Sequence, residues 1–249
     1  MNNTNTSTSV QPTASSHEGL LDATTQEMMK AGVHYGHRTS RTHPKMKPFI
    51  AGVKNNIEII DLEATRDQLE KATAFLKTLP KDALILFVGT LPPSQSIVRE
   101  ITEELGCLSV TERWLGGLLT NFKMVSGRIK NMIDLKKKRL AGEFEKYTKK
   151  EQQGINHEIQ RAERVFSGHD ALVRIPDALV VVGVTPHMTA INEARIKKVP
   201  IIALVDTDAS PVLIDYPIAA NDNARSSIAY ILSKLAIAIK EARGTEKVL

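Results

Sequence analysis

The sequence predicts an α/β protein with a doubly wound, mostly parallel five-stranded sheet and an inserted antiparallel helical hairpin. Short apolar runs alternate with segments of helical spacing, which is the order found in parallel sheets. Between the third and fourth runs lie two long basic segments whose apolar residues recur at helical spacing. A chain of 249 residues, 42% hydrophobic, is long enough for one large core with an appendage.

The expected strands are short. They cover residues 57–62, 83–88, 107–110, 178–184 and 201–205. The run at 83–88 is apolar at every position, as in a strand covered on both faces. Helices are expected at residues 19–31 and 65–79, from Pro92 to Gly106, between the last two strands, and at 224–243.

The inserted hairpin is expected at residues 119–168, which divides the sheet domain into residues 18–118 and 169–249. Narrow apolar stripes mark its two arms, at Val125, Ile129 and Met132, and at Ile155, Ile159, Ala162 and Phe166. They predict an antiparallel coiled coil with arms of about 20 residues, or roughly 30 Å. Gly142 is expected to end the first helix, and Thr148 with Glu151 to form a capping box at the second.

A structural junction is predicted just before the hairpin, at Trp114, Gly116 and Gly117. Glycines permit backbone conformations and close approaches that a Cβ would prevent, and Trp114 can bury a large apolar area beside them. Thr120 or Asn121 is expected to cap the helix that follows.

Positive charge is concentrated in two places, although the net charge is only +5. Residues 28–57 contain six Lys or Arg and no acid, and residues 122–168 contain twelve against six acids, which leaves −7 for the remainder. Such segregation is typical of proteins that bind a polyanion, and two solvated basic faces without a partner are the alternative. Residues 32–50, expected to form an extended loop, mix four cations with hydroxyls and aromatic rings, a composition suited to phosphates and exposed bases.

Several functional classes are disfavoured. No apolar run approaches the roughly 20 residues of a membrane span. Residues 1–17 resemble neither a signal nor a transit peptide and are expected to form a disordered polar tail. The single cysteine, Cys107, excludes an intramolecular disulfide and a Cys-rich zinc site. A zinc site at His34, His37 and His43 would lack a nearby carboxylate or cysteine.

An enzyme would place His187 as general base at the carboxyl ends of the strands, with Asp206, Asp208 and Asp215 holding a divalent ion. No phosphate-binding glycine motif follows any expected strand, so we expect no catalytic residue, cofactor or metal. Arg225 falls in the first turn of the last helix, where the helix dipole disfavours a cation. It is expected to pair with Asp222 or with a bound phosphate.

Eight segments in collinear order resemble the bacterial-type small ribosomal subunit protein two family. They are GVHYGH (32–37), PKMKPFI (44–50), IIDLEAT (59–65), FVGT (87–90), RWLGGLLTNF (113–122), PDALVVV (176–182), ALVDTD (203–208) and NDNARSSI (221–228). The resemblance spans about residues 20–241. It implies a flavodoxin-like parallel sheet with a coiled-coil hairpin and a non-catalytic role. We expect a cytoplasmic ribosome as its location, with an organellar ribosome as the alternative.

The resemblance also implies binding to small-subunit ribosomal RNA near the junction of head and body. Its other implied partners are neighbouring small-subunit proteins, including the multi-domain messenger-binding protein. We expect no binding to a membrane and no assembly into a homo-oligomer. A free-standing RNA-binding protein or protein adaptor is the alternative. We predict RNA contacts at Arg38, Arg41, Lys45, Lys47, Lys54, Arg113, Asn121, Lys123, Arg128, Lys130 and Arg225.

The chain departs from the family pattern at a few positions. Leu91, Pro92 and Pro93 stand where a basic pair is usual, which weakens the case for an RNA contact there. Asp208, Val212 and Ala220 replace the residues common in the loops beside Asp206.

Overall fold

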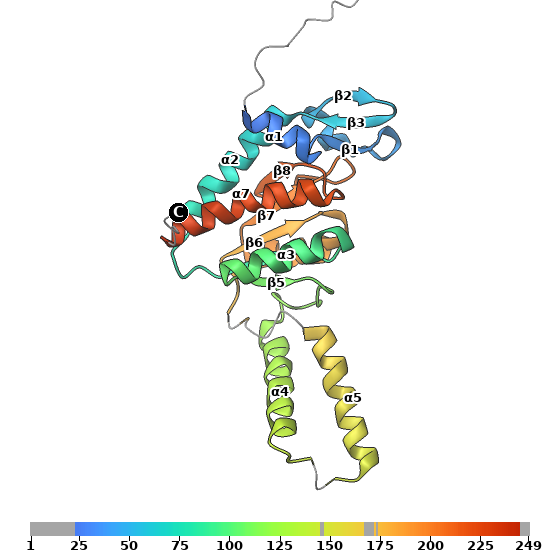
Figure 1. Cartoon of the computed structure of the whole chain (residues 1–249), viewed down its shortest axis with the longest axis vertical. Helices are drawn as coiled ribbons and strands as arrows, with labels where there is room; N and C mark the ends of the chain where they lie inside the picture. The colour runs from blue at the N-terminus through green and yellow to red at the C-terminus, as the bar shows by residue number, and fades with distance from the viewer. Residues whose placement is uncertain (1–22, 145–146, 167–171, 173, 245–249) are drawn as a thin grey trace, which may run out of the picture.

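The computed structural model describes residues 23–144, 147–166, 172 and 174–244. At its centre is a parallel sheet of five strands in the order β5-β4-β6-β7-β8 (Figure 1). The strands are β4 (Ile85–Val88), β5 (Leu108–Val110), β6 (Ala178–Val182), β7 (Ile201–Val205) and β8 (Tyr216–Ala219). The chain runs from β4 to β5 and returns to β6 on the other side of β4, so the sheet is doubly wound, as predicted.

Both faces of this sheet are covered. On one face Val180 and Val182 pack in a core with helices α1 (Ala23–Ala31), α2 (Leu62–Thr78), α3 (Pro92–Leu105) and α7 (Arg225–Arg243). On the other face Leu179 and Val181 pack with α6 (Met188–Lys197), which follows the short helix η3 (Thr185–His187). Successive strand residues thus point into different cores, which explains the unbroken apolar runs in the sequence.

A separate three-stranded antiparallel sheet, in the order β1-β3-β2, lies on the β8 side of the large sheet (Figure 1). Its strands are β1 (Tyr35–Arg38), β2 (Ile50–Lys54) and β3 (Ile57–Ile60), and the short helices η1 (Thr39–Arg41) and η2 (Pro44–Phe49) separate β1 from β2. The expected extended loop at 32–50 is therefore wrong. The predicted strand at 57–62 is β3, but it does not belong to the parallel sheet. Asn55 and Asn56, with φ of 53° and 62°, form a tight turn that pairs β3 with β2 instead.

The fifth strand of the parallel sheet is β8, which was not predicted. It contains Pro217, which cannot donate to a neighbouring strand, and it lies at the edge of the sheet. Edge positions tolerate proline because one side of the strand needs no partner. The predicted number of strands is therefore correct, but one of the five is a different segment.

Helices α4 (Phe122–Leu140) and α5 (Lys149–Phe166) lie side by side beyond the β5 edge (Figure 1). Ile129 and Met132 of α4 are buried, as is Ile159 of α5. Gly142, with φ of 72°, follows α4 as predicted, and the amide of Thr148 donates to Glu151 at 3.0 Å in the predicted capping box.

Three other sequence predictions have different outcomes. The side chains of Ala162 and Phe166 lie outside the described part of the chain, as do residues 1–17 and the start of the helix expected at 19–31. Neither Thr120 nor Asn121 caps α4, because the side chain of Asn121 makes no capping bond and Thr120 donates to Glu193. In the described ranges, no helix combines the length and the apolar content needed to cross a membrane.

Candidate nucleic-acid interface

All eleven residues predicted to contact RNA are exposed, and they fall into two groups. The first basic surface is on the small sheet and comprises Arg38, Arg41, Lys45, Lys47 and Lys54, with Arg225 nearby at the start of α7. The second basic surface adjoins the β5 edge and comprises Arg113, Asn121, Lys123, Arg128 and Lys130. The five-stranded sheet lies between the two surfaces (Figure 1).

The first basic surface is shaped by the helix η2. The side chain of His43 accepts a hydrogen bond from the amide of Lys45 at 3.2 Å, and Pro44 occupies the first helical position. Met46 is fully buried beneath the helix, whereas Lys45 and Lys47 on either side of it are exposed. The buried methionine therefore orients the two lysines toward solvent.

Thr207, which follows β7, fixes the small sheet to the large one. Its carbonyl accepts from the amide of His43 at 2.8 Å, and its hydroxyl accepts from the amide of His37 at 2.9 Å. A Cβ on Gly36 would lie 2.5 Å from the Thr207 side chain, so only glycine allows this approach.

His37 and two aspartates form a second connection at the same place. The His37 Nδ1 lies 3.2 Å from Asp206 Oδ1, at ion-pair distance but without good hydrogen-bond direction. Interaction with Asp206 is the main reason that the pKa of His37 rises to about 9. Burial, followed by the charges of Asp206 and Asp208, raises the pKa of Asp222 to about 7. Two titratable groups at this connection, on β1 and on the loop before α7, thus hold their protons more tightly than usual.

Arg225 lies near the first basic surface because the start of α7 is hydrogen-bonded to the end of α1 and to the segment between α1 and β1. The amide of Asn221 donates to the carbonyl of Val33 at 3.1 Å, and the hydroxyl of Ser226 donates to the carbonyl of Ala31 at 2.7 Å. Asp222 faces Asp206 instead of Arg225, so the predicted ion pair between Asp222 and Arg225 is wrong, and the bound phosphate at Arg225 stays a prediction.

Glu193, a buried residue of α6, holds the junction beside the second basic surface. Its Oε1 accepts from the indole N–H of Trp114 at 3.1 Å and from the amide of Gly117 at 2.8 Å. Its Oε2 accepts from the amides of Leu119 and Thr120, at 3.0 and 3.1 Å, and from the Thr120 hydroxyl at 3.1 Å. Five donors from one loop therefore converge on a single carboxylate.

The charge of Glu193 suits this arrangement. Burial raises the pKa of Glu193, but the bonds from Trp114 and the three amides outweigh burial, so its pKa lies below the ordinary value. Of the two predicted junction glycines, Gly117 has φ of 87° and requires the freedom of glycine, whereas a Cβ on Gly116 would meet nothing. Trp114 is half-buried and packs on the core behind it. Sequence reasoning missed Glu193, although an acid beside Ala190 and Ala194 on a helix was an available signal.

His187 is unsuited to catalysis because both ring nitrogens are engaged. Its Nδ1 contacts the carbonyl of Gly183 at 2.7 Å, and its Nε2 accepts from the amide of Thr90 at 3.1 Å. Burial lowers the pKa of His187, which favours the neutral ring that these contacts need. His187 thus bridges the ends of β4 and β6, where related sheets bind ligands.

The residues weighed for a metal do not converge. Asp215 accepts from the amide of Ile201 at the start of β7, whereas Asp206 follows the end of that strand. His34 packs on Tyr35, while His43 caps η2 and His37 faces Asp206. Within the described ranges, no group of three His, Cys, Asp or Glu residues is arranged to hold a metal ion.

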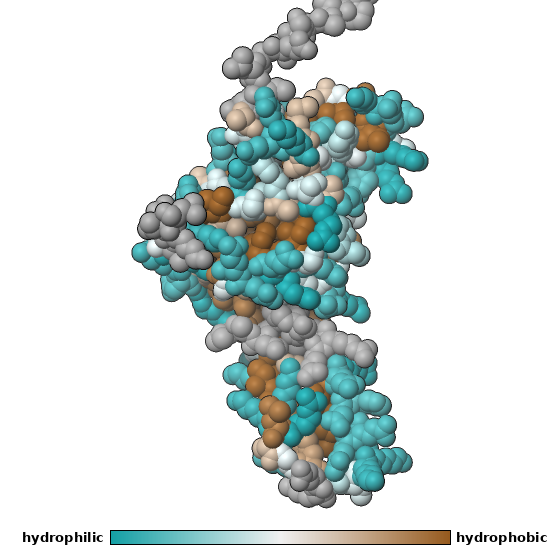
Figure 2. All heavy atoms as spheres, viewed as in Figure 1, coloured by the Kyte–Doolittle hydropathy of each residue, from teal (hydrophilic) through white to brown (hydrophobic). Residues whose placement is uncertain are grey.

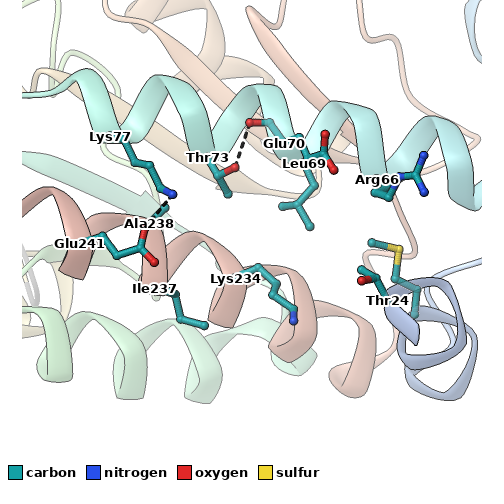
Figure 3. A pocket seen from close by; sticks show the side chains of 11 residues that line it. Thr24, Arg66, Leu69, Glu70, Thr73, Lys77, Lys234, Ile237, Ala238 and Glu241 are labelled. Atoms are coloured by element: carbon teal, nitrogen blue, oxygen red, sulfur yellow. Dashed lines mark hydrogen bonds and ion pairs between the residues drawn. The ribbon is translucent and has the colours of Figure 1, made fainter. Parts of the chain in front are cut away.

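Two hollows accompany these features. One of about 360 Å³ lies between Trp114, Arg113 and His187 at the strand ends. The other, of about 210 Å³, lies between α1, α2 and α7, where the Lys77 ammonium and Glu241 carboxylate pair at 2.6 Å (Figure 3). Neither includes a residue of the first basic surface, and the second is lined only by residues of those three helices.

Comparison with known proteins identifies the family. The model of the family described as ribosomal protein S2 matches residues 28–242. The small ribosomal subunit protein uS2 of Thermus thermophilus is 43% identical over 90% of this chain and 88% of its own length. Those of Coprothermobacter proteolyticus and Dehalococcoides mccartyi are 42% and 39% identical, over 88% and 90% of this chain and 82% and 91% of their own lengths. The chain therefore belongs to the ribosomal protein S2 family and is a non-enzymatic structural protein.

Proposed function

We propose that this protein is a constituent of the small ribosomal subunit and binds ribosomal RNA through its two basic surfaces. The observation that carries the proposal is the exposure of all eleven predicted residues in two groups on either side of one sheet. The similar proteins of Thermus and Dehalococcoides are named as small ribosomal subunit proteins, which supports the same assignment.

The proposed mechanism is scaffolding. Each surface binds phosphates of a different RNA element, and the packed sheet keeps the two elements at a constant separation. Backbone contacts and shape dominate, because the deep groove of an RNA helix hides its bases from side chains. Glu193 and Thr207 support this role, since each fixes one basic surface to the sheet.

We propose further that residues 119–168 form an antiparallel coiled-coil hairpin, distinct from the sheet domain of residues 18–118 and 169–249. Burial of Met132 and Ile159 on the adjacent helices α4 and α5 supports it. Two further proposals rest on the family resemblance. They are binding near the head–body junction of a cytoplasmic ribosome and docking of the multi-domain messenger-binding protein.

Sedimentation of a cell lysate through sucrose gradients at low and high salt tests the proposal. The wild-type chain should migrate with the small subunit and be released as salt rises. Replacing Arg41, Lys45 and Lys47 by alanine should lower the salt at which release occurs, as should replacing Lys123, Arg128 and Lys130. The control replaces three exposed lysines outside both surfaces, Lys71, Lys81 and Lys197, and should be released at the wild-type salt concentration.

Two results would contradict the proposal. If the wild-type chain stays at the top of the gradient at both salt concentrations, it is a free-standing protein. If the two triple variants and the control are released at the same salt concentration, the basic surfaces do not carry the RNA contacts.

A further inference from the structure

On the central strand of the small sheet, an acidic side chain is buried and an apolar one is exposed. On β3, Glu58 and Ile60 point inward and are 4% and 1% exposed, whereas Ile57 and Ile59 point outward and Ile57 is 37% exposed. An antiparallel sheet with one solvated face normally places its polar residues outside and its apolar residues inside. The outward face of β3 is therefore built for contact with something other than water.

Strand pairing determines which residues share this outward face. Tyr35 of β1 pairs with Ile59, while Arg38 of β1 and Lys54 of β2 both pair with Ile57. Paired residues of neighbouring strands lie on the same side of a sheet, so these five side chains form one surface, called here the outward face. Figure 2 shows apolar side chains gathered over β2 and β3 with hydrophilic ones around them.

Tyr35 is the central feature of the outward face. Its side chain is 47% exposed, and the ring of His34 lies against it with the ring centroids 4.0 Å apart. This contact restricts the tyrosine ring before any partner arrives, which lowers the entropy cost of stacking on it. The exposed ring is thus held ready for a flat partner.

The charges of the outward face favour a nucleic acid over an apolar protein. Its polar residues are Arg38 and Lys54, both exposed cations, and it has no carboxylate because Glu58 points inward to the hydroxyl of Thr42. Arg38 and Lys54 lie on either side of Ile57, and Tyr35 lies in the neighbouring row, opposite Ile59. An exposed aromatic ring beside cations is an arrangement by which proteins hold single-stranded RNA, with a base on the ring and phosphates on the cations. A double helix would keep its bases stacked and out of reach of Tyr35.

We propose that the outward face binds an unpaired stretch of RNA, with one base stacked on Tyr35 and the flanking phosphates bound by Arg38 and Lys54. In the ribosome the stretch belongs to ribosomal RNA, so this step rests on the proposed function. It adds base stacking to the phosphate contacts of the first basic surface. The two differ in salt dependence, because stacking involves no release of counterions.

The test measures binding of the full chain to an oligouridylate of about ten nucleotides and to an RNA duplex of the same length. Tyr35→Ala should weaken binding to the single strand about tenfold without changing its dependence on salt, whereas Tyr35→Phe should bind as the wild type. Binding to the duplex should be unaffected by either change. The matched control is Tyr147→Ala, since Tyr147 is 43% exposed but lies beside α5, far along the chain from β1.

Ultraviolet crosslinking provides a second measurement that does not depend on variants. Mass spectrometry of the irradiated complex should find uridine attached to Tyr35. The proposal is overturned if Tyr35→Ala binds the single strand with wild-type affinity, or if crosslinks avoid β1 and β3. It is also overturned if Tyr35→Ala leaves RNA binding intact but weakens association with small subunits, because the outward face would then contact a protein. Failure of the proposed function looks different, since the wild-type chain itself would not sediment with subunits.

Discussion

Glu193 of α6 accepts a hydrogen bond from the indole of Trp114, a residue 79 positions earlier in the chain. The same carboxylate accepts four further bonds from the residues that lead into α4. The direction in which α4 leaves the sheet is therefore set by a buried anion as well as by apolar packing.

Glu193→Gln should destabilise the protein by about 3 kcal/mol, because an amide NH₂ group would face backbone donors that now meet a charged oxygen. Thermal melting followed by circular dichroism measures the loss. Glu103→Gln, an exposed acid on α3, is the control and should melt with the wild type. Equal melting of the Glu193 and Glu103 variants would mean that the carboxylate does not hold the junction.

Trp114→Phe should cost about 1.5 kcal/mol, since it removes one donor to a charged acceptor and keeps most of the ring packing. Trp114→Ala should cost about 3 kcal/mol, because the packing is lost as well. Combining Trp114→Phe with Glu193→Gln should give less than the sum of the two effects, by about 1 kcal/mol. Strict additivity in denaturant titrations would contradict a direct bond between the two side chains.

Stability should fall as pH rises from about 3.8 to about 9. The pKa of His37 rises from 6.5 to about 9 and that of Asp222 from 3.8 to about 7, so the folded protein binds protons more tightly than the unfolded chain. The contribution of Asp222 is present at low pH and lost by about pH 7, and that of His37 is present below 6.5 and lost by about 9.

Melting temperatures measured between about pH 3.8 and about pH 9 test this prediction. His37→Ala should flatten the decline in the upper part of the range, and Asp222→Asn in the lower part. His157→Ala, an exposed histidine of α5, should leave the profile unchanged. A His37→Ala profile that follows the wild type would show that Asp206 does not raise the pKa of His37 in the folded protein.

Asn56→Gly should stabilise the β2–β3 turn by about 0.5–1 kcal/mol. Asn56 has φ of 62°, where a side chain is unfavourable and glycine is not, and Asn-Gly is the preferred pair for this turn. Asn56→Ala should destabilise the protein for the same reason. Denaturant midpoints that rank the alanine variant above the glycine variant would contradict the turn geometry.

The parts of the fold that depend on local pattern could be predicted from the sequence. The apolar runs of β4, β6 and β7 and the glycines after α1 and α3 are local signals, and each lies where it was expected. The partner of a strand is not a local property, so β3 was assigned to the wrong sheet. Tyr216–Ala219 was missed because it is short, contains a proline and has only one neighbour in the sheet.

The predicted RNA contacts are exposed because charged residues among polar ones rarely find a place in a core. The hydrogen bonds that converge on Glu193 could not be predicted in the same way. They join residues 73 to 79 positions apart, and most of their donors are backbone amides, which every sequence possesses. The alternation of Glu58 with isoleucines in β3 is visible in the sequence. Only the structure shows that the glutamate side of the strand faces the core and the side of Ile57 and Ile59 faces outward.

The attachment of the small sheet has a consequence for biosynthesis. Val33, His37 and His43 are hydrogen-bonded to Asn221 and Thr207, so a segment that the ribosome makes early is positioned by one that it makes much later. At roughly 5–20 residues per second, the nascent chain must wait many seconds before that contact can form. Until then the residues of the first basic surface are not yet fixed to the large sheet. Only the finished polypeptide presents both basic surfaces at a fixed spacing.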